Sequence, residues 1–299
     1  MRNHVYVISE IGSNFNGSLE IAKQYIRASK EAGADAVKFQ SIRKDRLIAP
    51  RVLEDGKLVD NPVYRNCTFC ELPEEWYPAL KEEADRADIE FFSTPVYLEA
   101  VDILESVGVS TYKIASGDIT FYPLLEKVGR TGKRIILSTG ASNLSEIEIA
   151  LKKLRDAGAG EIVLLHCVSN YPPAWSEINL LAMKTLRERF NVPVGISDHS
   201  PGSLIPIAAV ALGGVVIEKH VTFDRSLAGP DHAYAMTMEE FGDMIRQVRL
   251  LEQALGSGEK VPTETELLKL KRLRRGIYDR NSLEPSESPD GFWLRPRHH

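Results

Sequence analysis

Eight short apolar runs, each followed by a longer segment with helical spacing of its apolar residues, succeed one another along most of this chain. An alternation of this kind predicts parallel strands connected by helices. The expected strands occupy residues 5–12, 36–40, 90–95, 111–116, 134–140, 161–169, 192–200 and 215–223. Eight such units are the pattern of a (β/α)₈ barrel, so we predict an α/β protein with the TIM-barrel fold.

The eight units account for residues 1–256, which we predict to form one catalytic barrel domain. Residues 257–299 contain a basic amphipathic segment at 264–275, followed by a tail rich in Ser, Pro and charged residues. This segment is too short and too polar for a second core, so we expect a helix and a polar tail, with no second folded domain.

Local signals mark several helix ends and one unusual connection. Ser18 and Gly33 are expected to begin and end the first helix, and Ser145 and Gly158 are expected to do the same after the fifth strand. The connection at 41–72 is long for a compact domain, and it follows the C-terminal end of a strand. We interpret it as a lid over the functional site.

Composition excludes several classes of protein. With 43% hydrophobic and 26% charged residues, and without an apolar stretch long enough to cross a bilayer, the chain is typical of a soluble globular protein with no membrane partner. A net charge of −5 argues against a nucleic-acid partner. The N-terminal segment lacks the pattern of a signal peptide, and three cysteines agree with a reducing compartment, so we expect a cytoplasmic protein. Cys67 and Cys70 form a single CxxC pair, which is too few ligands for a structural zinc site.

Polar residues occur at the C-terminal end of every predicted strand, which is where barrel enzymes carry their active sites. They are Glu10, Lys38, Gln40, Ser93, Thr94, Lys113, Ser116, Ser138, Thr139, His166, Ser169, Ser197, Asp198, His199, Glu218, Lys219 and His220. Each of them alone is commonly a turn, cap or hydrogen-bonded core residue. Together they predict a polar mouth of the barrel.

Lysines and hydroxyls in this set indicate a site for an anion. Lys38 and Lys113 supply cationic donors, and the neighbouring serines and threonine supply hydroxyls, a combination that suits a phosphate or a carboxylate.

Two histidines at the ends of neighbouring strands favour a metal site. His199 and His220 could share one divalent metal ion through neutral imidazoles and leave positions open for other ligands. A histidine at a strand end is commonly structural, and the metal interpretation depends on the nearby carboxylates of Asp198, Glu218 and Asp231 as outer partners.

Eight segments of the chain stand out together: "SEIGSNFNGSLE" (9–20), "VKFQ" (37–40), "FFSTP" (91–95), "YKIASGD" (112–118), "LSTG" (137–140), "LLHCVSNYP" (164–172), "VGISDHS" (194–200) and "IEKHVTFDRSLAGPDHA" (217–233). In the order and spacing of these segments, the chain resembles the sialic acid synthase family over roughly residues 5–255. The resemblance implies a barrel enzyme that condenses phosphoenolpyruvate with an N-acylated hexosamine, giving a nine-carbon acidic sugar and phosphate.

The resemblance also implies roles for individual residues. A divalent metal, most commonly Mn²⁺ with Mg²⁺ or Co²⁺ as alternatives, would be bound by His199 and His220, and Glu10 would orient or deprotonate the attacking water. Phosphoenolpyruvate would contact Lys38, Thr94, Lys113, Ser116, Ser138 and Ser197. The sugar would contact Glu10, Gln40, Asp118, Tyr171 and Asp231, and Ser169 joins the expected substrate-binding residues. The resemblance further implies a homodimer.

The sequence departs from the family pattern at two places. Phe15 replaces the usual histidine of an "NHNG" motif. Most members also carry a small C-terminal domain resembling antifreeze proteins, and here "RRGIYDRNS" (274–282) resembles only the entrance to it. We therefore expect the barrel domain without that cover.

Two other functions stay open. One is another phosphoenolpyruvate-using sugar-acid synthase, which would need arginines at the mouth of the barrel to bind a phosphorylated aldehyde. The other is a non-catalytic barrel that binds sugars.

Overall fold

The structure is a computed structural model that describes residues 4–66 and 70–294, so Cys67 lies outside the described residues. The chain divides into two compact units, Met1–Leu255 and Gly256–His299, and each is described by itself.

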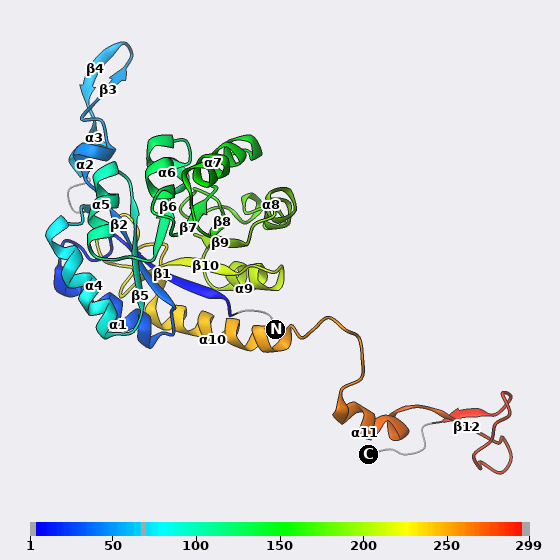
Figure 1. The fold of residues 1–299 in the computed structure, drawn as a ribbon. Coiled ribbons are helices and arrows are strands. Elements are labelled where there is room, and N and C mark those ends of the chain that lie inside the picture. The colour runs from blue at the N-terminus through cyan, green and yellow to red at the C-terminus, as the bar shows by residue number, and fades with distance from the viewer. Residues whose placement is uncertain (1–3, 67–69, 295–299) are drawn as a thin grey trace. The chain divides into compact units, whose positions relative to one another are not determined.

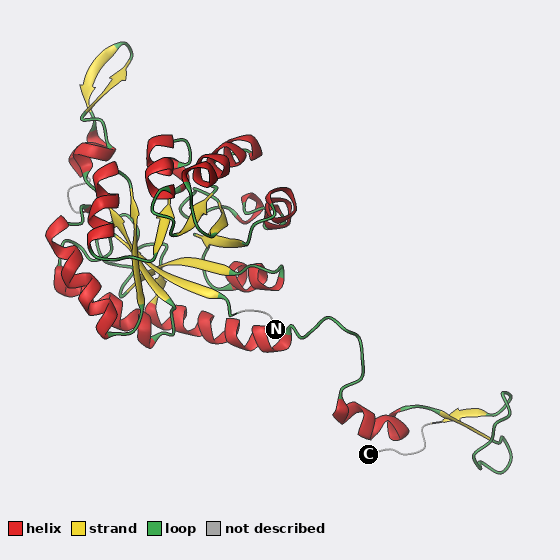
Figure 2. Ribbon diagram, viewed as in Figure 1, coloured by secondary structure: helices red, strands yellow, loops and turns green. Residues whose placement is uncertain are grey.

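Eight parallel strands form the sheet of the first unit. They are β1 (Tyr6–Gly12), β2 (Ala36–Ser41), β5 (Glu90–Pro95), β6 (Thr111–Ile114), β7 (Arg134–Ser138), β8 (Ile162–Cys167), β9 (Val194–Asp198) and β10 (Val216–Thr222). Their hydrogen-bonded order is β5-β2-β1-β10-β9-β8-β7-β6, so the first strand pairs with both β2 and the last strand of the set, β10. Figure 2 shows the strands gathered at the centre with helices around them. The predicted TIM-barrel fold is confirmed.

Helices follow these strands and cover the outside of the sheet (Figure 1). They are α1 (Leu19–Glu31), α4 (Tyr77–Arg86), α5 (Leu98–Ser106), α6 (Tyr122–Gly129), α7 (Leu144–Ala157), α8 (Ala182–Phe190), α9 (Leu204–Ala211) and α10 (Met238–Ala254). Short 3₁₀ turns occupy Glu74–Trp76, Ser116–Asp118 and Trp175–Glu177, and β11 (Met236–Thr237) pairs with β10.

The helix ends show where local sequence signals were sufficient. Ser18 caps α1 as predicted, because its hydroxyl accepts from the backbone N–H of Ile21. The expected cap at Ser145 is wrong, since α7 begins at Leu144, directly after Asn143, whose side chain accepts from the N–H groups of Ser145 and Glu146. Ser145 is already inside the helix, so its hydroxyl cannot take the capping position. Gly158 ends α7 as predicted, with a φ of 100°.

The alternation of side chains along each strand separates an apolar floor from a polar mouth inside the barrel. One cluster of buried residues takes inward positions on six of the strands, with two of them on β8, namely Ile8, Ala36, Phe92, Ile136, Val163, Leu165 and Val216. Because side chains repeat every two residues along a strand, the next inward positions after Ile8, Ala36 and Val216 are Glu10, Lys38 and Glu218. The polar residues therefore lie directly above this apolar floor.

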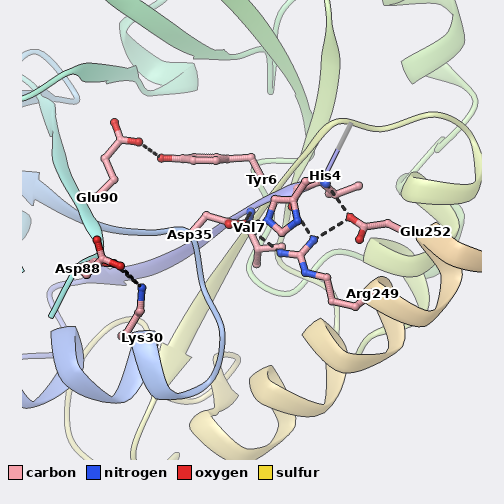
Figure 3. A network of polar contacts seen from close by, with 10 residues as sticks. His4, Tyr6, Val7, Lys30, Asp35, Asp88, Glu90, Arg249 and Glu252 are labelled. Atoms are coloured by element: carbon pink, nitrogen blue, oxygen red, sulfur yellow. Dashed lines mark hydrogen bonds and ion pairs between the residues drawn. The ribbon is translucent and has the colours of Figure 1, made fainter. Parts of the chain in front are cut away.

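A polar network ties the beginning of β1 to α10 (Figure 3). The carboxylate of Asp35 accepts from the backbone N–H of Val7 at 2.7 Å and from Arg249 at 3.1 Å, and it contacts Nε2 of His4 at 2.6 Å. Arg249 also pairs with Glu252 at 2.7 Å. These contacts fix the N-terminal strand against the last helix of the barrel.

The long connection after β2 forms a small arm of its own. It contains α2 (Lys44–Leu47), the antiparallel strands β3 (Arg51–Glu54) and β4 (Lys57–Asp60), and α3 (Pro62–Asn66). Contacts at its base hold the arm: Leu72 N–H donates to Ile42 O at 3.3 Å, and Arg43 pairs with Glu74 at 3.1 Å. In Figure 1 the β3–β4 hairpin extends away from the sheet.

The second unit contains α11 (Glu264–Leu273) and a short antiparallel pair, β12 (Gly276–Tyr278) and β13 (Phe292–Leu294). The helix agrees with the expected amphipathic segment, whereas the β12–β13 ladder was not predicted. In the part of the chain that the structure describes, the helices are all too short or too polar to cross a bilayer.

Candidate active site

A cavity of about 560 Å³ opens at the C-terminal ends of the barrel strands. It brings together twelve of the residues predicted for the site: Glu10, Lys38, Gln40, Thr94, Lys113, Ser116, Ser138, Ser169, Tyr171, Ser197, His199 and His220. Asp118 and Asp231, which belong to the same predicted set, are not among the residues that line it. The strand-end positions therefore converge on one cavity, and the two exceptions come from loops.

Lys38 lies deep in this cavity between two carboxylates. Its Nζ is 2.7 Å from Glu10 Oε2 and 3.5 Å from Glu218 Oε2, and it donates to Thr94 Oγ1 at 3.1 Å. Burial alone would lower the pKa of Lys38, but Glu10 and Glu218 outweigh burial and raise it. The amide of Gln40 donates to the other Glu10 oxygen at 2.7 Å, so both oxygens of that carboxylate are engaged.

Lys113 has a different environment on the other side of Glu218. Its Nζ is 3.5 Å from Glu218 Oε1, and Ser197 Oγ donates to the same oxygen at 2.9 Å. Here burial outweighs the attraction of Glu218, so the pKa of Lys113 is lowered. The two lysines, acting together against burial, hold the pKa of Glu218 below its usual range. Glu218 was expected among the polar strand-end residues, and the structure shows that it lines the cavity between the two lysines.

The two histidines face each other at the ends of β9 and β10. Their ring centroids are 5.3 Å apart, and both side chains are buried. Nδ1 of His199 lies 3.2 Å from the carbonyl oxygen of Val168, which leaves Nε2 of that ring for another partner. Burial, followed by the neighbouring His220, lowers the pKa of His199 to about 3, so its imidazole is neutral near pH 7.

Lys219 points to the opposite side of β10 from this pair. It is 1% exposed, its Nζ is 2.5 Å from Asp198 Oδ2, and it also donates to the carbonyl oxygen of Ser200. Lys219 therefore forms an internal ion pair, and it fixes the end of β10 against β9.

Asp231 lies beside the histidines although it does not line the cavity. Its Oδ2 is 3.9 Å from Nδ1 of His220, and its Oδ1 accepts from the hydroxyl of Tyr234 at 2.5 Å. The ring of Tyr234 lies 5.2 Å from that of His220 and 5.4 Å from that of Tyr171. Tyr234 was not predicted, and the only signal for it is its place immediately after "GPDHA".

Gly140 leaves room for three side chains of the cavity wall. A Cβ at this position would lie 2.3 Å from Ser169 Oγ, 2.8 Å from Ser116 Oγ and 3.3 Å from Cys167 Sγ. The backbone N–H of Gly140 donates to Ser116 Oγ at 2.9 Å. Cys167 is buried, takes the inward position after Leu165 and lines the cavity. Small residues thus keep this wall open and rich in hydroxyl groups.

Asp118 ends the 3₁₀ turn after β6, outside the cavity lining. Burial raises the pKa of its carboxyl group to about 6, with partial opposition from Lys113. The negative charge of this carboxylate, which lies near the site, is therefore poorly compensated by positive groups.

The arm at 41–72 does not form the lid that its length suggested. Its described residues are absent from the cavity lining, which passes from Gln40 directly to Thr94. The reason is structural: the arm pairs with itself as the β3–β4 hairpin, and its base is fixed by the contacts of Arg43 and Leu72.

Residues 25–260 match the NeuB family. The chain is 41% identical over 288 residues to the N,N'-diacetyllegionaminic acid synthase of Legionella pneumophila, covering 93% of this chain and 81% of that protein. It is 35% identical over 288 residues to the pseudaminic acid synthase of Campylobacter jejuni, covering 95% and 84%.

A solved structure supports the same relation. The N-acetylneuraminic acid (sialic acid) synthetase of Leptospira borgpetersenii, crystallised with citrate, superimposes with a TM-score of 0.81 at 34% sequence identity. The match covers 90% of this chain and 91% of that one.

Proposed function

The chain belongs to the NeuB family, whose enzymes include the sialic-acid-type synthases, and on that premise we propose that it condenses phosphoenolpyruvate with an N-acylated hexosamine. The products would be a nine-carbon acidic sugar and phosphate. The observation that carries this proposal is the pair of buried lysines, Lys38 and Lys113, within one hydroxyl-lined cavity that also contains two facing histidines.

The ligand class follows from the chemistry of the cavity. Phosphoenolpyruvate carries a phosphate and a carboxylate on a three-carbon unit, and two ammonium groups with several hydroxyl donors suit two such anionic groups. Ser116, Ser138 and Ser197 line the same cavity as Lys113. Because these groups are fixed on strands or directly after them, they order the ligand before reaction and lower the entropic part of the barrier.

The histidine pair fits a divalent metal. Nδ1 of His220 is buried without a hydrogen-bond partner among the described residues, and His199 retains Nε2 for a ligand. Residues 4–66 and 70–294 offer no group of three or more His, Cys, Asp or Glu side chains suited to a metal, so the protein would contribute two ligands. We propose Mn²⁺, with Mg²⁺ or Co²⁺ as alternatives, and when bound it would act as a Lewis acid toward the sugar aldehyde.

The residues of the chain have defined tasks in this reaction. The methylene carbon of phosphoenolpyruvate forms the new bond to the aldehyde carbon, water adds to the enol carbon, and the bond from that carbon to the phosphate oxygen breaks. Lys38 and Lys113 hold the anionic groups during these steps. Glu10 would orient the attacking water, because its two oxygens are fixed by Lys38 and Gln40 in a constant direction.

The sugar would occupy the side of the cavity near Gln40, Tyr171 and the histidines. Relatives are named for different acidic sugars, legionaminic and pseudaminic acids, so the identity of the amino sugar is the variable part of the substrate. A homodimer is part of the same proposal, drawn from the resemblance to the family.

A synthase acting on a phosphorylated aldehyde is less well supported. Such a substrate brings a second phosphate, which proteins bind preferentially with arginine. In the described part of the chain, the cationic side chains lining the cavity are Lys38 and Lys113, and arginine is absent from the lining.

Phosphate release tests the proposal. The purified full chain would be assayed with phosphoenolpyruvate, Mn²⁺ and a panel of N-acylated and phosphorylated hexoses. We expect phosphate release with at least one N-acylated, unphosphorylated hexosamine. Release only with phosphorylated aldehydes would favour the other synthase class, and no release with any sugar despite tight binding of one would favour a sugar-binding barrel.

A substitution at Lys113 adds a direct control for the anion site. Lys113→Ala removes one charge-assisted hydrogen bond, so kcat/KM for phosphoenolpyruvate should fall by the equivalent of about 2–3 kcal/mol. An unchanged kcat/KM would show that Lys113 serves the fold alone.

A further inference from the structure

Glu218 lies between the two lysines that the proposed function uses. Oε1 is 3.5 Å from Lys113 Nζ, and Oε2 is 3.5 Å from Lys38 Nζ. Ser197 Oγ donates to Oε1 at 2.9 Å, which fixes the orientation of the carboxylate, while Oε2 is buried without a hydrogen-bond partner among the described residues. The carboxylate thus bridges two ammonium groups, and it has no hydrogen-bond donor to offer a ligand.

The two lysines depend on this carboxylate to different degrees. Lys38 has a closer partner in Glu10, at 2.7 Å, and a hydroxyl partner in Thr94. Lys113, in contrast, forms its ion pair with Glu218. Other ionisable groups that influence Lys113 are Lys38 on β2, Glu10 on β1, Cys167 on β8 and Asp118 after β6. Of these groups, Lys38 disfavours the charged form of Lys113. The carboxylates of Glu10 and Asp118 lie farther from Lys113 than the carboxylate of Glu218 does.

We propose that Glu218 is a positioning residue that keeps Lys113 charged and aligned with Lys38 for the two anionic groups of phosphoenolpyruvate. This inference rests on the proposed function for the identity of the ligand. A buried ammonium group without a counter-charge loses its proton more readily, because burial penalises its charged form. Glu218 therefore has a cost and a benefit: it repels the anionic ligand, and it preserves the cation that binds it.

These two effects predict that the affinity of Glu218→Gln for phosphoenolpyruvate, relative to that of wild type, reverses with pH. The substitution keeps the shape of the side chain and removes its charge. At low pH both lysines remain protonated, so the variant has lost only a repulsive charge and should bind phosphoenolpyruvate as tightly as wild type or more tightly. At high pH Lys113 becomes neutral earlier in the variant than in wild type. Affinity should then fall below wild type by roughly tenfold or more, the loss typical of a missing charge-assisted hydrogen bond.

Binding calorimetry of the full chain with phosphoenolpyruvate, from about pH 6 to about pH 9, measures this reversal. Wild type and variant are compared at each pH, so ionisation of the ligand cancels. Glu90→Gln is the matched control, because Glu90 is a carboxylate at the opposite end of the barrel that accepts from Ser110 and Thr111, each at 2.6 Å. It should bind phosphoenolpyruvate as wild type does at every pH.

A second measurement does not depend on binding or turnover. The side-chain nitrogen resonance of Lys113, assigned through Lys113→Arg, should titrate at lower pH in Glu218→Gln than in wild type and should be unaffected in Glu90→Gln. If Glu218→Gln does not fold, Ser197→Ala, which removes the hydroxyl that orients Glu218, should shift the titration in the same direction.

The outcomes separate this inference from the proposed function. An equal loss of affinity at all pH values, or an unchanged Lys113 titration, would overturn the role of Glu218 and show that it supports the fold alone. If wild type fails to bind phosphoenolpyruvate, the proposed function fails, and the Lys113 titration still decides whether Glu218 sustains its charge.

Discussion

Replacing Lys219 with methionine should destabilise the barrel strongly, although the residue does not line the cavity. Lys219→Met keeps the length of the apolar stem and removes the ammonium group that lies 2.5 Å from Asp198 Oδ2. Asp198 is 4% exposed, so its carboxylate cannot recover the lost partner from solvent. It would retain only the N–H and hydroxyl of Ser200, each at 3.0 Å.

Removing one partner of a buried ion pair costs about 3–5 kcal/mol, because the other charge remains buried and uncompensated. For a domain of this size each kcal/mol lowers the melting temperature by roughly 2–4 °C. The expected decrease is therefore roughly 6–20 °C. Adding Asp198→Asn removes the carboxylate charge that Lys219→Met leaves without its partner, so the double variant should recover part of the lost melting temperature.

Thermal melting followed by circular dichroism measures the effect. Lys127→Met is the control, since Lys127 pairs with Asp102 at a similar distance, 2.6 Å, on the exposed surface. An exposed pair contributes about 0–1 kcal/mol, so this variant should melt within a few degrees of wild type. If Lys219→Met melts no lower than Lys127→Met, the buried pair does not stabilise the strand end as argued.

Three further predictions concern the cavity. His199→Ala and His220→Ala should each abolish most binding of Mn²⁺, measured by calorimetry, while the melting temperature of the metal-free protein stays near wild type; undiminished metal binding would remove the histidines from the metal site. Gly140→Ala should lower kcat/KM by roughly tenfold or more with little change in melting temperature, because the added Cβ would lie 2.3 Å from the Ser169 hydroxyl and would displace this side chain of the cavity wall. Asp118→Asn should raise the melting temperature by roughly 2–4 °C at pH 7.5 but not at pH 4. Burial raises the folded-state pKa of Asp118 to about 6, so ionising this carboxyl group destabilises the fold, and the destabilisation grows as pH rises from the ordinary pKa of Asp to about 6. An equal shift at both pH values would contradict the assignment to this carboxyl group.

The barrel could be predicted from the sequence because eight apolar runs alternate with helical segments. Side chains along each strand repeat every two residues, so inward positions such as Ile8, Glu10, Val216 and Glu218, and with them the floor and the strand-end site, are implied by the order of residues. Cys167 follows the same repeat, since it stands two positions after inward-facing Leu165.

Loops carried less information. The hairpin within 41–72 has a recognisable signal, Asp55-Gly56 between alternating runs, and both residues have positive φ values of 49° and 76°. The length of the connection led instead to the interpretation of a lid. Asp118 ends a short 3₁₀ turn and Asp231 lies in a loop, where no strand repeat fixes the direction of a side chain, so their absence from the cavity lining could not be predicted.

The pairing of β1 with β10 also affects how the chain is made. Tyr6 pairs with Val216, which the ribosome adds about 210 residues later. At a synthesis rate of about 5–20 residues per second, the first strand waits roughly 10–40 s for one of its two neighbours. During that time the apolar edge of β1 is available to other chains on the same messenger RNA. Slower translation lengthens this exposure, so aggregation of nascent chains should depend on elongation rate as well as on the stability of the finished barrel.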